Sequence, residues 1–234
     1  MALRRIGLHK TTLVDFPGEL AATVFTPGCN LRCPYCHNPR LVLPPCPEDM
    51  ITLDELDAFL DRRAGLLGGV CITGGEPLLH DDLPDLLHLV RRHGLKIKLD
   101  TNGCFPDRLS GILVDYVAMD LKTAPSRYEI LLGEKVDPHD GSTADRIRAS
   151  VEYLRHSGIA YELRTTVVPG IVGTADMEEM VPLLPGAARY VLTPFRGGTT
   201  LDPSWADLPS PGEDLLRGLC ELAETSGVPC EIRY

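Results

Sequence analysis

The sequence predicts an α/β fold in which parallel strands alternate with helices, arranged as a (β/α)6 partial barrel. From Leu20 onward, apolar runs of strand length alternate with helical patterns, giving six strand–helix units in a row. Strands joined through helices are parallel, because a tight turn joins only antiparallel neighbours. Periodicity alone suits an open doubly wound sheet equally well. We favour the barrel because unusual polar residues follow several different strands, whereas a doubly wound sheet gathers its site at one switch point.

The expected strands are short apolar runs, and most of them end in polar or glycine-rich segments. The first run leads into a cysteine-rich loop, and the second leads into a Gly-Gly-Glu-Pro turn at 74–77. The next two runs end at Asp100 and Asp120. A short closing strand is expected at an edge of the sheet. The strand ranges are 20–25, 69–73, 95–99, 115–119, 159–168 and 189–193, with the closing strand at 230–234.

Helices are expected between these strands from capping signals and apolar spacing. Thr52 and Glu55 form a capping box, and the Ser-Pro-Gly-Glu run at 210–213 reads as a second one with proline at the first helical position. Gly94 and Gly158 are expected to end two of the helices, because glycine readily adopts the left-handed conformation found there. The expected buried faces are Leu53, Leu56 and Leu60; Leu83, Leu86, Leu87 and Val90; Ile147, Val151 and Leu154; Met177, Met180, Val181 and Leu184; and Leu215, Leu216, Leu219 and Leu222.

Length and composition indicate one soluble domain. A chain of 234 residues is long enough to build one large core. The formal net charge of −10 disfavours a surface that follows nucleic-acid phosphates. No apolar run is long enough to span a membrane, residues 1–5 lack the start of a signal peptide, and the eight cysteines suit a reducing cytoplasm. We expect one domain, with an N-terminal extension at 1–19, the partial barrel at 20–200 and a C-terminal helix and short strand at 201–234.

Three clustered cysteines are the strongest chemical signal in the chain. Cys29, Cys33 and Cys36 are spaced C-x3-C-x2-C directly after the first expected strand. An odd number of thiols cannot pair among themselves, but thiolates can converge on one soft centre, an iron–sulfur cluster or zinc. A four-iron cluster bound by three cysteines leaves one iron without a protein ligand. An open position of this kind is where a substrate or cosubstrate can bind.

A structural zinc site is the alternative reading of the same cysteines, and it would make the chain a zinc-stabilised binding module. His37 or a distant cysteine would then complete a tetrahedron. Zinc motifs usually consist of two pairs, and no second pair exists here. We therefore favour the cluster over zinc. The other cysteines are isolated along the chain: Cys46, Cys71, Cys104, Cys220 and Cys230.

The cysteine run, with His37 and Asn38 after it, resembles the radical S-adenosylmethionine (SAM) enzymes in the form found in glycyl-radical-enzyme activases. The run at 6–18, Ile-Gly-Leu-His-Lys-Thr-Thr-Leu-Val-Asp-Phe-Pro-Gly, is similar to the opening of activating proteins for anaerobic ribonucleoside-triphosphate reductase. The resemblance covers about residues 7–203. It implies a partial TIM barrel of the radical SAM type. It also implies a [4Fe–4S] cluster on the three cysteines, with SAM bound to the fourth iron.

The same resemblance implies a reaction and partners. Reductive cleavage of SAM would give a 5′-deoxyadenosyl radical, which abstracts hydrogen from a glycine of the partner reductase. The cofactors would carry this chemistry, so no catalytic side chain is assigned. The electron donor would be a flavodoxin or ferredoxin, with no nucleic acid or membrane involved. The irregular section 123–141, read as a loop or lid, and the region 10–18 are candidate docking sites for the partner. Two alternatives stay open: activation of another glycyl radical enzyme of the pyruvate formate-lyase type, and action on a small molecule such as a deazapurine precursor.

The resemblance also assigns roles to single residues. The turn Gly74, Gly75 and Glu76 would bind the amino group of the SAM methionine, although a plain βα turn would look the same. Tyr35 would pack against adenine. Further expected SAM contacts are Asp100, Asn102, Lys122, Arg164 and Arg196, of which Arg196 stands where pyruvate formate-lyase activases have a histidine.

A monovalent cation beside SAM is a further expectation. Asp100 and Asp120 follow neighbouring strands, and oxygen ligands of this kind gather hard cations. By resemblance, Thr101 would join them. The alternative is an Asx-type turn in the run 100–103 and a helix cap at Asp120. Strand alternation places Lys96 and Lys98 on the same face as Asp100, and the sequence gives them no firm role.

Overall fold

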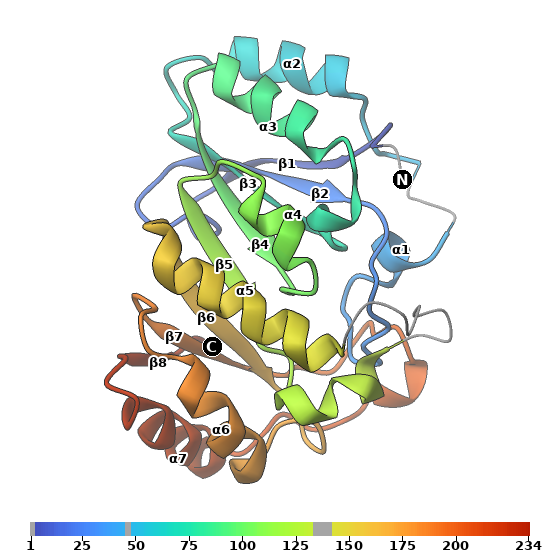
Figure 1. The fold of residues 1–234 in the computed structure, drawn as a ribbon. Coiled ribbons are helices and arrows are strands. Elements are labelled where there is room, and N and C mark those ends of the chain that lie inside the picture. The colour runs from blue at the N-terminus through green and yellow to red at the C-terminus, as the bar shows by residue number, and fades with distance from the viewer. Residues whose placement is uncertain (1–2, 45–47, 133–141) are drawn as a thin grey trace. The chain divides into compact units, whose positions relative to one another are not determined.

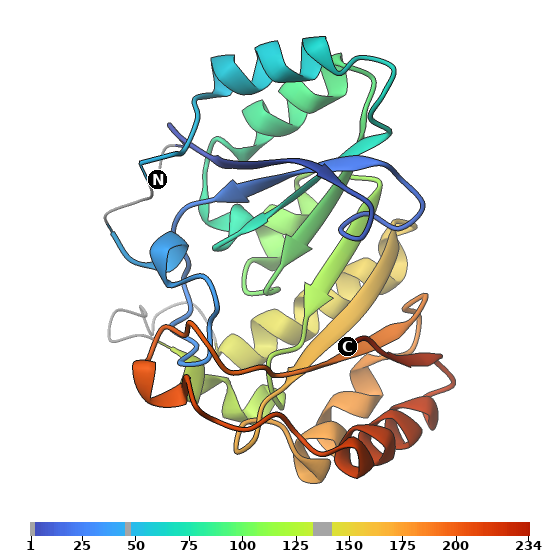
Figure 2. The same cartoon turned by 180° about the vertical axis from the view of Figure 1, so that it is seen from behind.

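The computed structural model describes residues 3–44, 48–132 and 142–234. The chain divides into two compact units, shown in Figures 1 and 2. The first unit consists of Met1–Asn30, Asn38–Thr101 and Gly111–Val117. The second unit consists of Leu31–His37, Asn102–Ser110 and Ala118–Tyr234. The boundary passes through the cysteine run, so Cys29 belongs to the first unit.

The first unit is built on a sheet whose strands follow one another in chain order. The strands are β1 (Gly7–Thr12), β2 (Ala21–Thr26), β3 (Gly69–Gly74) and β4 (Lys96–Thr101). The last three are parallel, as predicted, and β1 runs antiparallel beside β2 (Figure 2). The sequence analysis did not identify β1. Its central residues are exposed, so it lacks the apolar run on which strand prediction depends.

Helices α2 (Leu53–Arg62) and α3 (Leu83–Arg92) lie side by side in the first unit (Figure 1). The predicted capping box at α2 is confirmed, since the Glu55 N–H donates to Thr52 Oγ1 (3.2 Å) and the Thr52 N–H donates to Glu55 Oε2 (2.7 Å). Two short elements were not predicted, α1 (Pro39–Val42) and the 3-10 helix η1 (Pro77–Leu79).

The second unit has parallel strands β6, β7 and β8 in chain order, and helices α6 and α7 lie side by side in it (Figure 1). Strand β5 (Tyr116–Asp120) begins in the first unit and ends in the second. The other elements of the second unit are α4 (Pro106–Ser110), η2 (Pro125–Leu131), α5 (Thr143–Ser157), β6 (Ala160–Val167), α6 (Thr174–Met180), η3 (Val181–Leu183), β7 (Tyr190–Pro194), η4 (Pro203–Trp205), α7 (Glu213–Glu224) and β8 (Cys230–Ile232).

Three predictions about the second unit were wrong in detail. Helix α7 begins at Glu213 with Gly212 as its N-cap and no side-chain cap, so the capping box at 210–213 does not form. Leu215 is exposed, because the buried stripe of α7 runs through Leu216 and Leu219. The section 123–141 is not irregular throughout, since η2 occupies part of it; residues 133–141 lie outside the described residues.

The core is formed by apolar strand residues and by the inner faces of the helices. Strand residues such as Val24, Ile72 and Leu99 are fully buried, as expected for parallel strands covered on both faces. Each large apolar side chain buried in this way contributes roughly 1.5–3 kcal/mol. Within the described ranges, no helix has the length and apolar character needed to cross a membrane.

Candidate active site

The two glycines after β3 allow one backbone to lie directly against another in the first unit. Gly74 has φ +118°, a conformation that residues with a side chain rarely adopt, and a Cβ there would lie 2.4 Å from the Thr26 nitrogen. A Cβ on Gly75 would lie 1.8 Å from the Gly28 carbonyl oxygen. The turn after β3 therefore packs against the residues just before Cys29. The predicted contact of this turn with SAM stays a prediction.

Glu76 is a buried carboxylate that fixes this turn. Its Oε1 accepts hydrogen bonds from the Leu78 N–H (3.0 Å) and from the Thr101 hydroxyl (2.8 Å). The Glu76 side chain therefore ties the start of η1 to the end of β4. Thr101, the predicted cation ligand, uses its hydroxyl proton in this contact.

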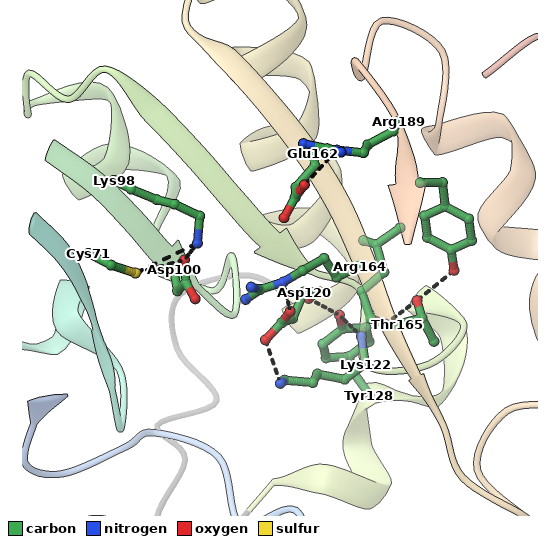
Figure 3. A network of polar contacts seen from close by, with 12 residues as sticks. Cys71, Lys98, Asp100, Asp120, Lys122, Tyr128, Glu162, Arg164, Thr165 and Arg189 are labelled. Atoms are coloured by element: carbon green, nitrogen blue, oxygen red, sulfur yellow. Dashed lines mark hydrogen bonds and ion pairs between the residues drawn. The ribbon is translucent and has the colours of Figure 1, made fainter. Parts of the chain in front are cut away.

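Asp100 has a buried protein cation as its partner. Lys98 is 2% exposed, and its ammonium forms an ion pair with Asp100 Oδ1 (Figure 3). Lys98 also donates to Cys71 Sγ at 3.7 Å, and the Cys71 thiol donates to the same Asp100 oxygen at 3.7 Å. Buried lysines are rare unless they are paired. This pairing gives Lys98 the role that the sequence left open, whereas Lys96 is exposed and pairs with Glu19 (2.5 Å).

In the second unit, Asp120 lies between two basic side chains (Figure 3). Lys122 Nζ is 2.8 Å from Asp120 Oδ2, and Arg164 Nε is 2.9 Å from Asp120 Oδ1. Burial acts to raise the pKa of Asp120, but Arg164 and Lys122 outweigh burial and lower this pKa to about 2. Burial acts to lower the pKa of Lys122, and the Asp120 carboxylate outweighs it, so this pKa is raised. Asp120 is therefore ionised and both cations are charged at neutral pH.

Tyr128, on η2, is a neighbour of this group that the sequence analysis did not identify. Its hydroxyl accepts the Lys122 N–H at 2.9 Å. Burial raises the pKa of Tyr128 well above its ordinary value, so the hydroxyl keeps its proton. Tyr128 holds the backbone at Lys122. No local sequence signal marks this role, because the contact joins the 3-10 helix to the residues after β5.

The second half of the cysteine run is held by segments far along the chain. The Arg32 N–H donates to the Leu131 carbonyl (2.8 Å), and the Asp202 N–H donates to the Pro34 carbonyl (2.9 Å). His37 Nδ1 lies 2.9 Å from the Thr199 carbonyl oxygen, and the imidazole stacks on the Phe195 ring with centroids 5.4 Å apart. Through these contacts His37 braces the cysteine loop.

The thiol of Cys33 is buried, and the basic side chain that acts on it is that of Lys122. Burial raises its pKa, an effect that Lys122 partly offsets, and the resulting value is about 11. A cysteine must lose its proton to bind iron, so the Lys122 charge favours the form that a metal needs. The seven cysteines among the described residues form no disulfide, and Cys46 lies outside the described residues. No three His, Cys, Asp or Glu side chains in the described ranges are already gathered as a metal site.

Tyr35 has a buried hydroxyl that finds no hydrogen-bond partner among the described residues. Its ring lies 6.4 Å from the Trp205 ring, and Cys33 is one of the groups that raise its pKa, after burial itself. Buried polar atoms in folded proteins are nearly always bonded, so an unbonded one needs an explanation. A buried hydroxyl beside the Cys33 thiol, without a hydrogen bond of good geometry among the described residues, fits a site that receives a polar cofactor.

The predicted site residues are divided between the two units. Asn102 makes the Asx turn considered above, accepting the Cys104 N–H at 3.0 Å, and Arg196 is exposed after β7. The predicted residues of the first unit are Cys29, Gly74, Gly75, Glu76, Asp100 and Thr101. Those of the second unit are Cys33, Tyr35, Cys36, Asn102, Asp120, Lys122, Arg164 and Arg196.

Comparisons with known proteins identify the fold and the relatives. The radical SAM superfamily matches residues 23–183 of this chain. A protein of Methanocaldococcus jannaschii, named as a candidate glycyl-radical enzyme activating enzyme, is 28% identical over 223 residues, covering 93% of this chain and 90% of that protein. The pyruvate formate-lyase-activating enzyme of Staphylococcus aureus is 39% identical over 205 residues, covering 78% of this chain and 76% of that enzyme.

A solved structure carries the same fold. A radical SAM methyltransferase from Sphaerobacter thermophilus superimposes with a TM-score of 0.66 at 20% identity, covering 94% of this chain and 67% of that one. At that identity the likeness concerns the fold alone. It confirms the predicted fold class, a partial TIM barrel of the radical SAM type.

Proposed function

Since this chain belongs to the radical SAM superfamily and, within it, to the glycyl-radical enzyme activases, we propose that it generates a glycyl radical on anaerobic ribonucleoside-triphosphate reductase. Because the chain belongs to an enzyme family, we set aside the alternative of a zinc-stabilised binding module. The C-x3-C-x2-C run is the observation that carries the chemistry, and the resemblance of residues 6–18 to activators of that reductase supports the partner.

Enzymes of this superfamily use a [4Fe–4S] cluster and SAM, and this chain has residues that suit both. Cys29, Cys33 and Cys36 would hold the cluster, because they supply three thiols outside any disulfide within one short loop. When bound and supplied with one electron from a flavodoxin or ferredoxin, the cluster and SAM provide a 5′-deoxyadenosyl radical, which takes a hydrogen atom from the target glycine. The chain itself would bind and orient the cluster and SAM, and it would exclude water from them.

The basic group of the second unit is the proposed contact for the charged end of SAM. Lys122 and Arg164 share one carboxylate, Asp120, and all three side chains are partly exposed. Two positive charges around one negative charge suit a ligand that brings a carboxylate of its own. Asp120 keeps both basic side chains in place, so it acts on the ligand through them. Tyr35, with its unbonded hydroxyl, is the proposed neighbour of the adenosine.

Partner recognition is proposed for the region 10–18. Leu13 and Val14, which follow β1, are 77% and 81% exposed. Adjacent exposed apolar side chains of this kind are typical of protein contact sites. A Leu13→Ser, Val14→Ser double variant should lose partner activation while it still cleaves SAM. Equal loss of both activities would contradict docking at this region.

The pyruvate formate-lyase type of partner is the second candidate, favoured by the 39% identity to the Staphylococcus aureus enzyme. The deciding experiment mixes anoxically reconstituted protein, SAM and a reductant with each purified glycyl radical enzyme in turn. Electron paramagnetic resonance then detects the glycyl doublet. We expect the doublet with the reductase, and we expect Cys33→Ala to abolish it while Cys220→Ala does not. A doublet with pyruvate formate-lyase alone would select the second candidate, and a protein that takes up zinc but no iron or sulfide would contradict both.

A further inference from the structure

Three consecutive carbonyl groups just before Cys29 accept hydrogen bonds from one short segment of the first unit. The Gly75 N–H donates to the Thr26 carbonyl at 2.8 Å, and the Glu76 N–H donates to the Gly28 carbonyl at 2.8 Å. Between these two, His80 Nε2 lies 2.7 Å from the Pro27 carbonyl oxygen. The sequence analysis did not identify His80, because a single histidine after a turn carries no motif.

The geometry defines what His80 does in this set. A carbonyl oxygen only accepts, so the Nε2 of His80 carries the hydrogen of this bond. Both His80 and Pro27 are buried, so water does not replace the bond if the imidazole is removed. The other two donors are backbone N–H groups, which every residue type except proline supplies. His80 is therefore the position where a side chain decides whether the carbonyl is bonded.

The residue that follows Pro27 explains why this bond matters. Gly28 has φ +82°, in the left-handed region, and glycine reaches many other conformations at little cost. The Gly28 N–H is held by the Leu41 carbonyl (2.6 Å), and its own carbonyl is held by the Glu76 N–H. The His80 bond fixes the peptide on the amino side of Gly28. Together these contacts restrict the one flexible residue between β2 and Cys29.

We propose that His80 is a positioning residue of the cysteine loop, which holds the Pro27 peptide so that the chain enters Cys29 in a single conformation. The inference rests on the proposed function in that the loop is taken to carry the cluster. It predicts that losing the imidazole loosens the loop, so that the protein retains iron less well. His80 does not contact the cluster or the substrate in this role; it acts through the backbone at Pro27.

The test compares His80→Leu with His80→Gln, whose amide nitrogen can donate to the same carbonyl. His93→Leu is the matched control. His93, the residue that follows α3, also makes a 2.7 Å hydrogen bond within the first unit, between its Nε2 and Asp57 Oδ1. Hydrogen exchange of the full chain without cluster, followed by mass spectrometry, should show the 24–32 peptide exchanging about tenfold faster in His80→Leu. Release of iron from the anoxically reconstituted protein to a chelator should accelerate by a similar factor. His80→Gln and His93→Leu should stay within about twofold of the wild type in both measurements.

Two results would overturn the proposal: unchanged exchange and iron release in His80→Leu, or the same acceleration in His93→Leu. If His80→Leu does not fold, His80→Asn is compared with His80→Gln instead. The asparagine side chain is one methylene shorter, so its amide does not reach the Pro27 carbonyl. Equal hydrogen exchange and equal iron release in His80→Asn and His80→Gln would then contradict the proposal. A wild-type protein that takes up no iron would defeat the proposed function instead, while the exchange measurement would still decide the role of His80.

Discussion

Two groups of charged side chains, one in each unit, are buried to different degrees. In the first unit, Glu76 and Lys98 are 0% and 2% exposed, and each has specific protein partners. In the second unit, the side chains of Asp120, Lys122 and Arg164 are 25%, 21% and 21% exposed. Glu76 and Lys98 are therefore enclosed, as Glu162 of the second unit also is, whereas the group of Asp120, Lys122 and Arg164 stays partly open to solvent and places two cations around one carboxylate.

This difference distinguishes charged side chains that hold the fold together from charged side chains that can contact a ligand. A fully buried charge must have its partners inside the protein, since an unpaired one is strongly destabilising. Such a group fixes a backbone, as Glu76 does for the turn after β3. Partly exposed charges with fixed neighbours keep access to a charged ligand. We expect substitutions at the enclosed charges Glu76 and Lys98 to act on stability, and substitutions in the group of Asp120, Lys122 and Arg164 to act more on binding.

The largest expected effect is in the first unit, for Lys98→Met. Removing the ammonium leaves the Asp100 carboxylate without its buried cation, which costs about 3–5 kcal/mol in the free energy of unfolding. Denaturant unfolding measures this cost. Lys96→Met is the matched control, because Lys96 is 59% exposed in its pair with Glu19 and should change stability by less than about 1 kcal/mol. A double variant with Asp100→Asn should recover part of the loss; equal costs for Lys98 and Lys96 would remove the distinction between enclosed and open charge.

Glu76 gives the next largest effect. Glu76→Ala leaves the Leu78 N–H and the Thr101 hydroxyl without their acceptor in the interior, which should cost about 2–4 kcal/mol. Glu76→Gln keeps an acceptor oxygen and should cost less. Thermal and denaturant unfolding of both variants measure the difference. If Gln and Ala were equally destabilising, the negative charge rather than the two hydrogen bonds would hold the turn.

Asp120 should make the second unit sensitive to acid. Its pKa is lowered from 3.8 to about 2 in the folded chain, so its contribution is fully present above about pH 4 and is lost as the pH falls toward 2. The shift corresponds to about 2 kcal/mol. The difference in unfolding free energy between wild type and Asp120→Asn, measured from pH 6 downward, should shrink across that window. A difference that does not vary with pH would show that the two basic neighbours do not stabilise the carboxylate.

The smallest expected effect is at Tyr35. Its buried hydroxyl makes no hydrogen bond of good geometry to the part of the chain that the structure describes, so Tyr35→Phe should leave the stability of the protein without cofactor unchanged or raise it by up to about 1 kcal/mol. Tyr128→Phe is the control, since the Tyr128 hydroxyl accepts the Lys122 N–H and its loss should cost about 1–2 kcal/mol. Calorimetry of both variants checks this. A large cost at Tyr35 would mean that the hydroxyl is bonded in solution and does not await a ligand.

Local signals explain which elements could be predicted from the sequence. The capping box of Thr52 and Glu55 and the left-handed Gly158 after α5 involve neighbouring residues, so the sequence contains the complete interaction. The alternation of strands and helices likewise determined the parallel fold. The cysteine spacing pointed to the cofactor for the same reason: all three thiols belong to one loop. β1 was missed because its stability comes from pairing with β2 and not from its own apolar residues.

The pairing of polar groups was decided by the tertiary structure. Glu76 and His80 have partners that depend on how a turn packs, which the sequence does not show. Lys98 and Asp100 share one face of β4 by strand alternation, and the fold decided that Lys98 is buried there. Asp100 was expected to bind a cation, and the fold brings it a lysine two residues away on the same face of β4. The sequence by itself determined the class of fold and predicted the chemistry of the loop, because both follow from short-range pattern. Which charges are enclosed and which stay open depended on the fold, because burial is a property of the surroundings and not of the residue.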